Sequence, residues 1–263
     1  MIRLSVKNLS TNNFFLIAGP CVLESQSHAI FMAKEIKKIC DSLEVDLIFK
    51  ASWDKANRTK LKNYRGFGLA EAIVIFKAIK ELTGVKIITD FHLPEQADKL
   101  KGAVDYLQVP AFLCRQTDML VAAAKTGLPV CVKKGQFMSA EAMEAVVDKI
   151  RSSGGEEVYA VERGNIFGYN NLIVDMLNLP KMRKFVPVVF DASHTTQIGC
   201  VGGSSGAYPE YTPYLAKAAV AVGIDGLFLE VHDNPEKALC DGKSMLKLDK
   251  LQDLLVQLKG DNG

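Results

Sequence analysis

A dense group of cations stands between Phe49 and Gly66, in the stretch FKASWDKANRTKLKNYRG. The stretch begins at the end of the apolar run VDLIF, and its basic residues are Lys50, Lys55, Arg58, Lys60, Lys62 and Arg65. Asp54 is the only acid among them, although the whole chain of 263 residues has a formal net charge of only +2. Because this charge is local, we expect it to bind a local anion such as a phosphate or carboxylate group.

Further polar residues stand at the ends of other apolar runs. In chain order these ends read GPC, KAS, TDFH, QVPAF, KKGQ, ERG, DASH and LEVH. The pattern predicts a mouth that contains the cations Lys50, Lys55, Arg58, Lys133, Lys134 and Arg163. Cations around one cavity repel each other unless multiply charged anions bind between them. The mouth is therefore predicted to hold a phosphorylated and carboxylated substrate, whereas Lys60 and Lys62 are interpreted as solvated surface residues.

A second group of side chains at or beyond the strand ends could bind a metal. Its members are Cys21, His92, His194, Glu230, His232 and Asp241. A thiolate, an imidazole and two carboxylates suit Zn(II), Fe(II) or Mn(II). The spacing gives no support, since these residues span more than 200 positions. The residues alone favour the interpretation of Cys21 as a small buried residue in a tight turn.

The elements that must position these residues are short apolar strands alternating with amphipathic helices. The predicted strands are 14–19, 45–50, 85–90, 104–109, 129–134, 158–163, 186–191 and 226–231, and helical patterns include 29–43, 69–84, 117–127 and 140–155. Eight strands alternating with helices over this length predict a single (β/α)8 barrel domain, residues 1–263, whose active site lies at the carboxyl ends of the strands. An open doubly wound sheet is the alternative, but no glycine-rich GxGxxG turn follows the first strand.

The composition also bounds the setting of the protein. A net charge near zero gives no argument for binding to nucleic acid or to a membrane surface. The longest apolar runs are far below the roughly 18 residues of a membrane span, and no signal peptide is recognisable. Six scattered cysteines without a CxxC pair predict reduced thiols and a cytoplasmic location.

The motifs SWDKANRT, PAFLCRQTD, VKKGQF, ERGNIFGYNNL, FDASH and LEVHDNPEKALCDG occur in this order. Through these motifs, the chain from residue 14 to residue 258 resembles the 3-deoxy-D-manno-octulosonate 8-phosphate synthase family. Its near relative, 3-deoxy-D-arabino-heptulosonate 7-phosphate synthase, typically has a KPRTS-like stretch where this chain has KANRT. The resemblance implies a homotetrameric barrel that condenses phosphoenolpyruvate with D-arabinose 5-phosphate and water, in lipopolysaccharide biosynthesis.

The resemblance also implies roles for individual residues. Lys50, Ser52 and Lys55 would hold the carboxylate of phosphoenolpyruvate. Gln108, the backbone of Ala111, Lys133 and Arg163 would hold its phosphate. Asn57 and Arg58 would bind the pentose phosphate, while Arg115 and Gln116 would come from a neighbouring subunit.

The family has a metal-dependent and a metal-free class, and members of the first class resemble this chain in having Cys in the GPC turn. The implied ligands of a Zn, Fe(II), Mn or Co ion are Cys21, His194, Glu230 and Asp241. Asp241 lies in CDG, a variant more typical of metal-free members.

The chemistry requires carbon 3 of phosphoenolpyruvate to attack the sugar aldehyde while water adds to carbon 2. Lys55 and His194 are the expected catalytic residues beside Asp90 and His92, which could move protons to or from that water. Asp90 and His92 could equally be a hydrogen-bonded pair at a strand end without a catalytic role. Two rival functions are a Schiff-base aldolase with a barrel lysine and a non-catalytic barrel that senses sugar phosphates.

Overall fold

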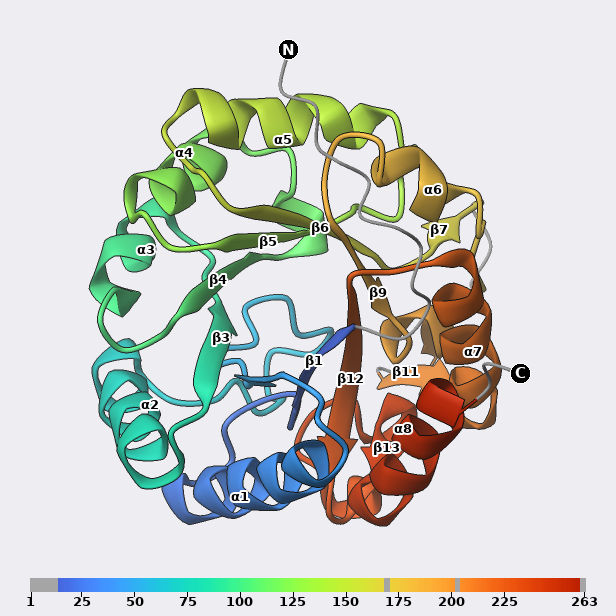
Figure 1. Cartoon of the computed structure of the whole chain (residues 1–263). Coiled ribbons are helices and arrows are strands. Elements are labelled where there is room, and N and C mark those ends of the chain that lie inside the picture. Colours follow the sequence, from blue (N-terminus) through green and yellow to red (C-terminus); the bar gives the residue numbers. More distant parts are fainter. Residues whose placement is uncertain (1–13, 168–170, 202–203, 261–263) are drawn as a thin grey trace.

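The chain forms a closed barrel of parallel strands surrounded by helices (Figure 1). The computed structural model describes residues 14–167, 171–201 and 204–260. The barrel strands, in spatial order, are β1 (Phe15–Gly19), β2 (Leu47–Lys50), β3 (Lys86–Asp90), β4 (Tyr106–Val109), β5 (Val130–Lys133), β6 (Val158–Glu162), β9 (Val188–Asp191) and β12 (Gly226–His232). Pairing between β1 and β12 closes the ring, so the predicted (β/α)8 barrel is confirmed.

The helices lie outside the ring of strands, as Figure 1 shows. They are α1 (Gln26–Ser42), α2 (Leu69–Thr83), α3 (Pro94–Leu100), α4 (Thr117–Lys125), α5 (Ala142–Ser152), α6 (Asn178–Met182), α7 (Thr212–Val222) and α8 (Leu251–Gly260). Each long helix has an apolar stripe; in α1, for example, Met32, Ile36 and Cys40 are buried at helical spacing. These stripes pack on the outward-facing strand residues such as Leu16 and Phe49, and this layer forms the main core.

Inside the barrel, alternating strand residues form a smaller second core. Its buried members are Ile17, Ile48, Ile88, Cys131, Val161, Val189 and Phe228. Because side chains alternate across a strand, the residue two positions later on each strand also points inward. Those residues are Gly19, Lys50, Asp90, Lys133, Arg163, Asp191 and Glu230. The fold therefore places a layer of mostly charged side chains directly above an apolar plug.

Two small hairpins and a short extra strand complete the described structure. β7 (Asn165–Ile166) pairs with β8 (Leu172–Ile173), and β10 (Gln197–Val201) pairs with β11 (Ser204–Ala207). The strand β13 (Leu246–Lys247) extends the sheet beside β12. In the described ranges, no helix combines the length and the apolar character that a membrane crossing would need.

Gly19 is required where β1 approaches β2 at the level of the charged layer. A methyl group on this glycine would lie 2.1 Å from the backbone carbonyl oxygen of Lys50. Backbone cannot yield to such an overlap without shifting the strand that carries Lys50. We therefore expect Gly19→Ala to lower the free energy of unfolding by about 1–3 kcal/mol and to reduce activity.

The measurement is denaturant unfolding combined with an assay of turnover. Gly260→Ala is the matched control, because no heavy atom lies within 4 Å of the position of its added methyl group. A Gly19→Ala protein as stable and active as the parent would contradict the close packing of β1 on β2.

Candidate active site

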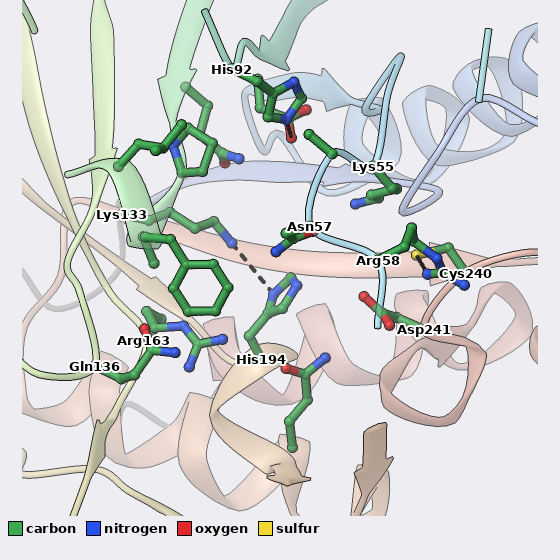
Figure 2. A pocket seen from close by; sticks show the side chains of 18 of the residues that line it. Lys55, Asn57, Arg58, His92, Lys133, Gln136, Arg163, His194, Cys240 and Asp241 are labelled. Carbon is green, nitrogen blue, oxygen red and sulfur yellow. Dashed lines mark hydrogen bonds and ion pairs between the residues drawn. The ribbon is translucent and has the colours of Figure 1, made fainter. Parts of the chain in front are cut away.

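A cavity of about 540 Å³ opens at the carboxyl ends of the barrel strands. This volume is typical of a small-molecule site. Five Lys and Arg side chains line it, namely Lys50, Lys55, Arg58, Lys133 and Arg163. Figure 2 shows Lys55, Lys133 and Arg163 arranged around the same space. The predicted cationic mouth is therefore present, apart from Lys134.

Lys134 does not belong to this cavity, which corrects the sequence interpretation. Its side chain is fully buried and donates hydrogen bonds to Met138 O, Gly164 O and Asn165 Oδ1. Its amino group also lies 3.3 Å from a carboxylate oxygen of Glu162. The physical reason is strand alternation: Lys133 points into the barrel, so its neighbour points out toward the helices.

The basic stretch after β2 divides into residues with different roles. Lys55, Asn57 and Arg58 line the cavity, whereas Arg65 forms an ion pair with Asp54. The Lys55 N–H donates to Arg65 O at 2.6 Å, which ties the two ends of this loop together. Of the six cations, Lys50, Lys55 and Arg58 therefore line the cavity, and these are the three that the sequence placed at its mouth.

Lys50 is held at the edge of the cavity by three contacts. Its amino group lies 3.1 Å from Cys21 O, 3.1 Å from Ser52 Oγ and 3.5 Å from Glu230 Oε1. Ser52 is fully buried, and the residues that line the cavity do not include it. In the structure as described, Ser52 therefore positions Lys50.

Lys133 is the most strongly constrained cation of the site. Its amino group makes a short contact with Asp191 Oδ2 and lies 3.4 Å from His194 Nδ1, as drawn in Figure 2. It also lies 3.7 Å from the centre of the Phe228 ring, which forms the floor below it. Burial lowers the pKa of Lys133, while the charge of Asp191 opposes that effect.

Asp191 is a site residue that the sequence interpretation missed. Its fully buried carboxylate contacts Lys133, accepts the backbone N–H groups of Ser193 and His194, and lies 2.8 Å from His194 Nδ1. Burial would raise its pKa, but the positive charges of His194 and Lys133 and their hydrogen bonds hold it well below its usual range. The available signal was its place at the end of a strand, directly before the SH pair of DASH.

Asp90 and His92 lie together on the opposite side of the cavity. Asp90 Oδ2 is 3.3 Å from His92 Nε2, and the indole N–H of Trp53 donates to Asp90 O at 2.9 Å. Although burial acts to raise the pKa of Asp90, the hydrogen bond and charge of His92, with Lys50 and Lys55, lower it. Both side chains line the cavity, where they could reach a bound substrate. Their role in moving protons stays a prediction.

The four predicted metal ligands come from distant parts of the chain and fall into two neighbouring groups, which share Asp241. Cys21 Sγ lies 3.6 Å from Asp241 Oδ2, and His194 Nε2 lies 3.6 Å from Glu230 Oε1. Donor atoms of His194, Glu230 and Asp241 all lie within 4.8 Å of one another. Ligand bonds of about 2.0–2.3 Å around one tetrahedral ion place donors roughly 3.5 Å apart, so this arrangement fits a divalent metal.

The protonation pattern also suits metal binding. His194 uses Nδ1 toward Asp191, which leaves Nε2 facing Glu230. Glu230 Oε2 is buried without a hydrogen-bond partner in the described part of the protein. Burial raises the pKa of Glu230, but His194, Lys50, Lys55 and Lys133 outweigh it and lower the pKa to about 2. The carboxylate is therefore charged at neutral pH.

Cys240 is a second site residue that the sequence interpretation missed. Its sulfur lies 3.2 Å from Cys21 Sγ, and it accepts a hydrogen bond from Arg58 Nη1 at 2.7 Å. It lines the cavity beside Asp241 (Figure 2). The signal was its position directly before the predicted ligand Asp241.

The remaining predicted substrate residues fall into two groups. Gln108 and Ala111 line the cavity, and Gln108 Oε1 is buried without a hydrogen-bond partner among the described residues. Arg115 and Gln116 are exposed and do not line it. The role at a neighbouring subunit that the resemblance implies for them stays a prediction.

The fold and this site define a barrel enzyme of a recognised kind. A family model described as the DAHP synthetase I family matches residues 5–262, and the chain belongs to that family. A relative named 2-dehydro-3-deoxyphosphooctonate aldolase, from Geobacter metallireducens, is 52% identical over 97% of this chain and 94% of the relative. A relative of the same name from Koribacter versatilis is 52% identical over 93% of this chain and 89% of the relative. A third relative of this name, from Geotalea uraniireducens, is 48% identical over 97% of both chains. The names specify the octonate sugar acid phosphate, so the resemblance found in the sequence is confirmed.

Asp191 gives a sharp test of the site's electrostatics. Asp191→Asn keeps the shape of the side chain but removes the charge that pairs with Lys133 and orients His194. We expect kcat to fall about 10–100-fold with a smaller change in KM for either substrate.

Steady-state kinetics of Asp191→Asn and Asp105→Asn make the comparison. Asp105 lies at the opposite end of the barrel, where it contacts Lys80 Nζ and the Ile87 N–H. Asp105→Asn is expected to lower thermal stability and leave kcat within about twofold. Equal loss of kcat in both variants would show that Asp191 acts only through stability.

Proposed function

We propose that the protein condenses phosphoenolpyruvate with D-arabinose 5-phosphate and water to give 3-deoxy-D-manno-octulosonate 8-phosphate and inorganic phosphate. The observation that most directly supports this function is the convergence of five Lys and Arg side chains on one cavity at the carboxyl ends of the strands. Six lining residues, Arg58, Asp90, His92, Gln108, Gln136 and Arg163, have a buried polar atom without a hydrogen-bond partner in the described structure. Such atoms are normally satisfied by a ligand or water. The printed names of the relatives support the same reaction.

The cations divide naturally between two anionic substrates. Lys133 and Arg163 flank the inner part of the cavity and would hold the phosphate of phosphoenolpyruvate. Lys50 and Lys55 would hold its carboxylate, while Asn57 and Arg58 at the mouth would bind the pentose phosphate. Each anionic group of the substrates would then meet a cation in the site, and this pairing offsets the free-energy cost of removing the charges from water.

In the reaction, carbon 3 of phosphoenolpyruvate bonds to the aldehyde carbon and water adds to carbon 2. The bond from carbon 2 to the phosphate oxygen then breaks, and phosphate leaves. Lys133 and Arg163 stabilise the charge that grows on the departing phosphate. Asp90 and His92 would take the proton from the attacking water and supply one to the oxygen of the former aldehyde.

Cys21, His194, Glu230 and Asp241 would hold a divalent ion of Zn, Fe(II), Mn or Co beside these groups. When bound, such an ion would polarise a substrate oxygen and orient water. Asp191 supports this role because it fixes the orientation of His194.

We further propose a homotetramer that works in the cytoplasm. Exposed Arg115 and Gln116 support shared sites, and the described cysteines are free thiols, as in reducing compartments.

Lys133 is the barrel lysine that a Schiff-base mechanism would use, because it is buried and burial lowers its pKa. Its ion pair with Asp191 favours the charged ammonium form, which opposes that rival mechanism.

The function is tested by phosphate release with phosphoenolpyruvate and each of two aldoses. We expect arabinose 5-phosphate to give a higher kcat/KM than erythrose 4-phosphate, because Asn57 can hydrogen-bond a sugar hydroxyl. The assignment fails if erythrose 4-phosphate is preferred. Borohydride added with both substrates should leave the protein mass unchanged, and a trapped lysine adduct would favour the Schiff-base mechanism.

The metal proposal is tested by chelation and by substitution of Cys21. The chelated parent should lose activity and recover with Zn(II), Fe(II), Mn(II) or Co(II). Cys21→Ala should lose both bound metal and nearly all activity, since it lacks the thiolate ligand. Cys21→Asn should bind little metal yet retain activity that chelators do not reduce, because the amide can hydrogen-bond where the metal would sit. A parent that is fully active with no detectable metal would reject the metal site.

The shared-site proposal predicts that Arg115→Ala mainly raises the KM for the pentose phosphate. Loss of a charge-assisted contact should cost on the order of 1.5–3 kcal/mol of binding free energy. Mixed oligomers of Arg115→Ala and the inactive Arg163→Ala should regain activity through hybrid sites. No regain in verified mixed oligomers would indicate a site built within one chain.

A further inference from the structure

Two cysteines from opposite ends of the chain meet at the edge of the cavity. Cys21 follows β1 in the GPC turn, and Cys240 lies between the short helices η4 (Pro235–Lys237) and η5 (Gly242–Ser244). Their sulfur atoms are 3.2 Å apart, and both residues are free thiols. Among the five cysteines whose side chains the structure describes, this is the only contact between two cysteine sulfurs. A disulfide bond is about 2.05 Å long, so a shift of roughly 1 Å would join them.

The two thiols differ in their access to small molecules. Cys240 lines the cavity, whereas Cys21 is fully buried behind it and does not. A water-sized oxidant in the cavity would therefore meet Cys240 first. The Arg58 guanidinium donates to Cys240 Sγ at 2.7 Å, which holds this sulfur at the edge of the cavity.

The pair also has the geometry of a reactive thiol with a resolving partner. Once Cys240 is oxidised, Cys21 Sγ is already in contact with it, and it is the nearest thiol among the five cysteines whose side chains the structure describes. Cys40 and Cys131 are buried elsewhere, and Cys114 contacts the sulfur of Met138 at 3.2 Å. Among these five cysteines, oxidation at Cys240 is therefore directed to a disulfide with Cys21.

We propose that hydrogen peroxide converts Cys21 and Cys240 into a reversible disulfide that withdraws Cys21 from metal binding. Cys240 Sγ attacks the O–O bond, forming a sulfenic acid and releasing one water. Cys21 Sγ then attacks the sulfenic sulfur, forms the S–S bond and releases a second water. The two thiols supply both electrons and both protons, and a dithiol reductant reverses the change by exchange.

The consequence for catalysis follows from ligand chemistry. A thiolate binds metal, whereas a disulfide sulfur cannot take its place. The loss of activity rests on the proposed function and its metal, but the disulfide itself does not.

The test treats the metal-free and zinc-loaded full-length protein with hydrogen peroxide and then counts thiols in denaturant. We expect the titre of the metal-free protein to fall by two from the six cysteines of the chain. A non-reducing digest should contain one cross-linked peptide pair that joins Cys21 to Cys240. Bound zinc should slow the cross-link at least tenfold, the oxidised protein should bind zinc at least tenfold more weakly, and dithiothreitol should restore both thiols.

Cys240→Ser and Cys40→Ser are the matched variants. Cys40→Ser should form the cross-link like the parent, whereas Cys240→Ser should lose no thiol pair and show no oxidation that dithiothreitol reverses. Absence of the cross-linked peptide from the parent, or the same reversible loss of two thiols in Cys240→Ser, would overturn the proposal. A cross-link in a protein without condensation activity would support the disulfide and reject the proposed function.

Discussion

The central constraint on this structure is that charges buried above an apolar plug must be paired. Lys133 and Asp191 are the clearest case, because their side chains are 7% and 0% exposed and in direct contact. Removing one partner of a buried pair typically costs 3–5 kcal/mol, so neither charge is independent of the other. Asp191 also orients His194, and His194 faces Glu230. One carboxylate thus links the cation expected at the phosphate to the expected metal ligands.

The same constraint explains why the cavity is suited to anions. Asp191 and Glu230 lie fully buried behind the lining, and Asp90 lies at its edge. Glu230 pairs with Lys50 and Asp191 with Lys133, which leaves Arg163 and the outer cations available to a ligand. Phe228 contributes from below, since its ring face lies 3.7 Å from the Lys133 amino group and favours a cation there. The site is therefore organised in its charges before any substrate binds.

Much of the fold was accessible from the sequence, and so was part of the site. All eight predicted barrel strands are present, because each is a short apolar run that ends abruptly in polar residues. Lys50, Lys133 and Arg163 could be placed for the same reason. The direction of the Lys134 side chain could not be predicted. Of two adjacent lysines at a strand end, one points into the barrel and the other out, and the sequence does not tell which until a neighbour such as Cys131 is known to point inward. Asp191 and Cys240 were missed because their importance lies in contacts with residues 58 and 219 positions away.

The contact between Cys21 and Cys240 shows how two sequence features acquire a joint meaning only in three dimensions. Cysteine in the GPC turn resembles metal-dependent members, and CDG resembles metal-free ones, so the two motifs pointed in different directions. In the folded chain they form one site, because Cys21 Sγ is close to both Cys240 Sγ and Asp241 Oδ2. Since a sulfur bonded to another sulfur cannot also serve as a thiolate ligand, metal binding and disulfide formation compete for Cys21. The oxidation state of one side chain would then set the metal content of the whole site.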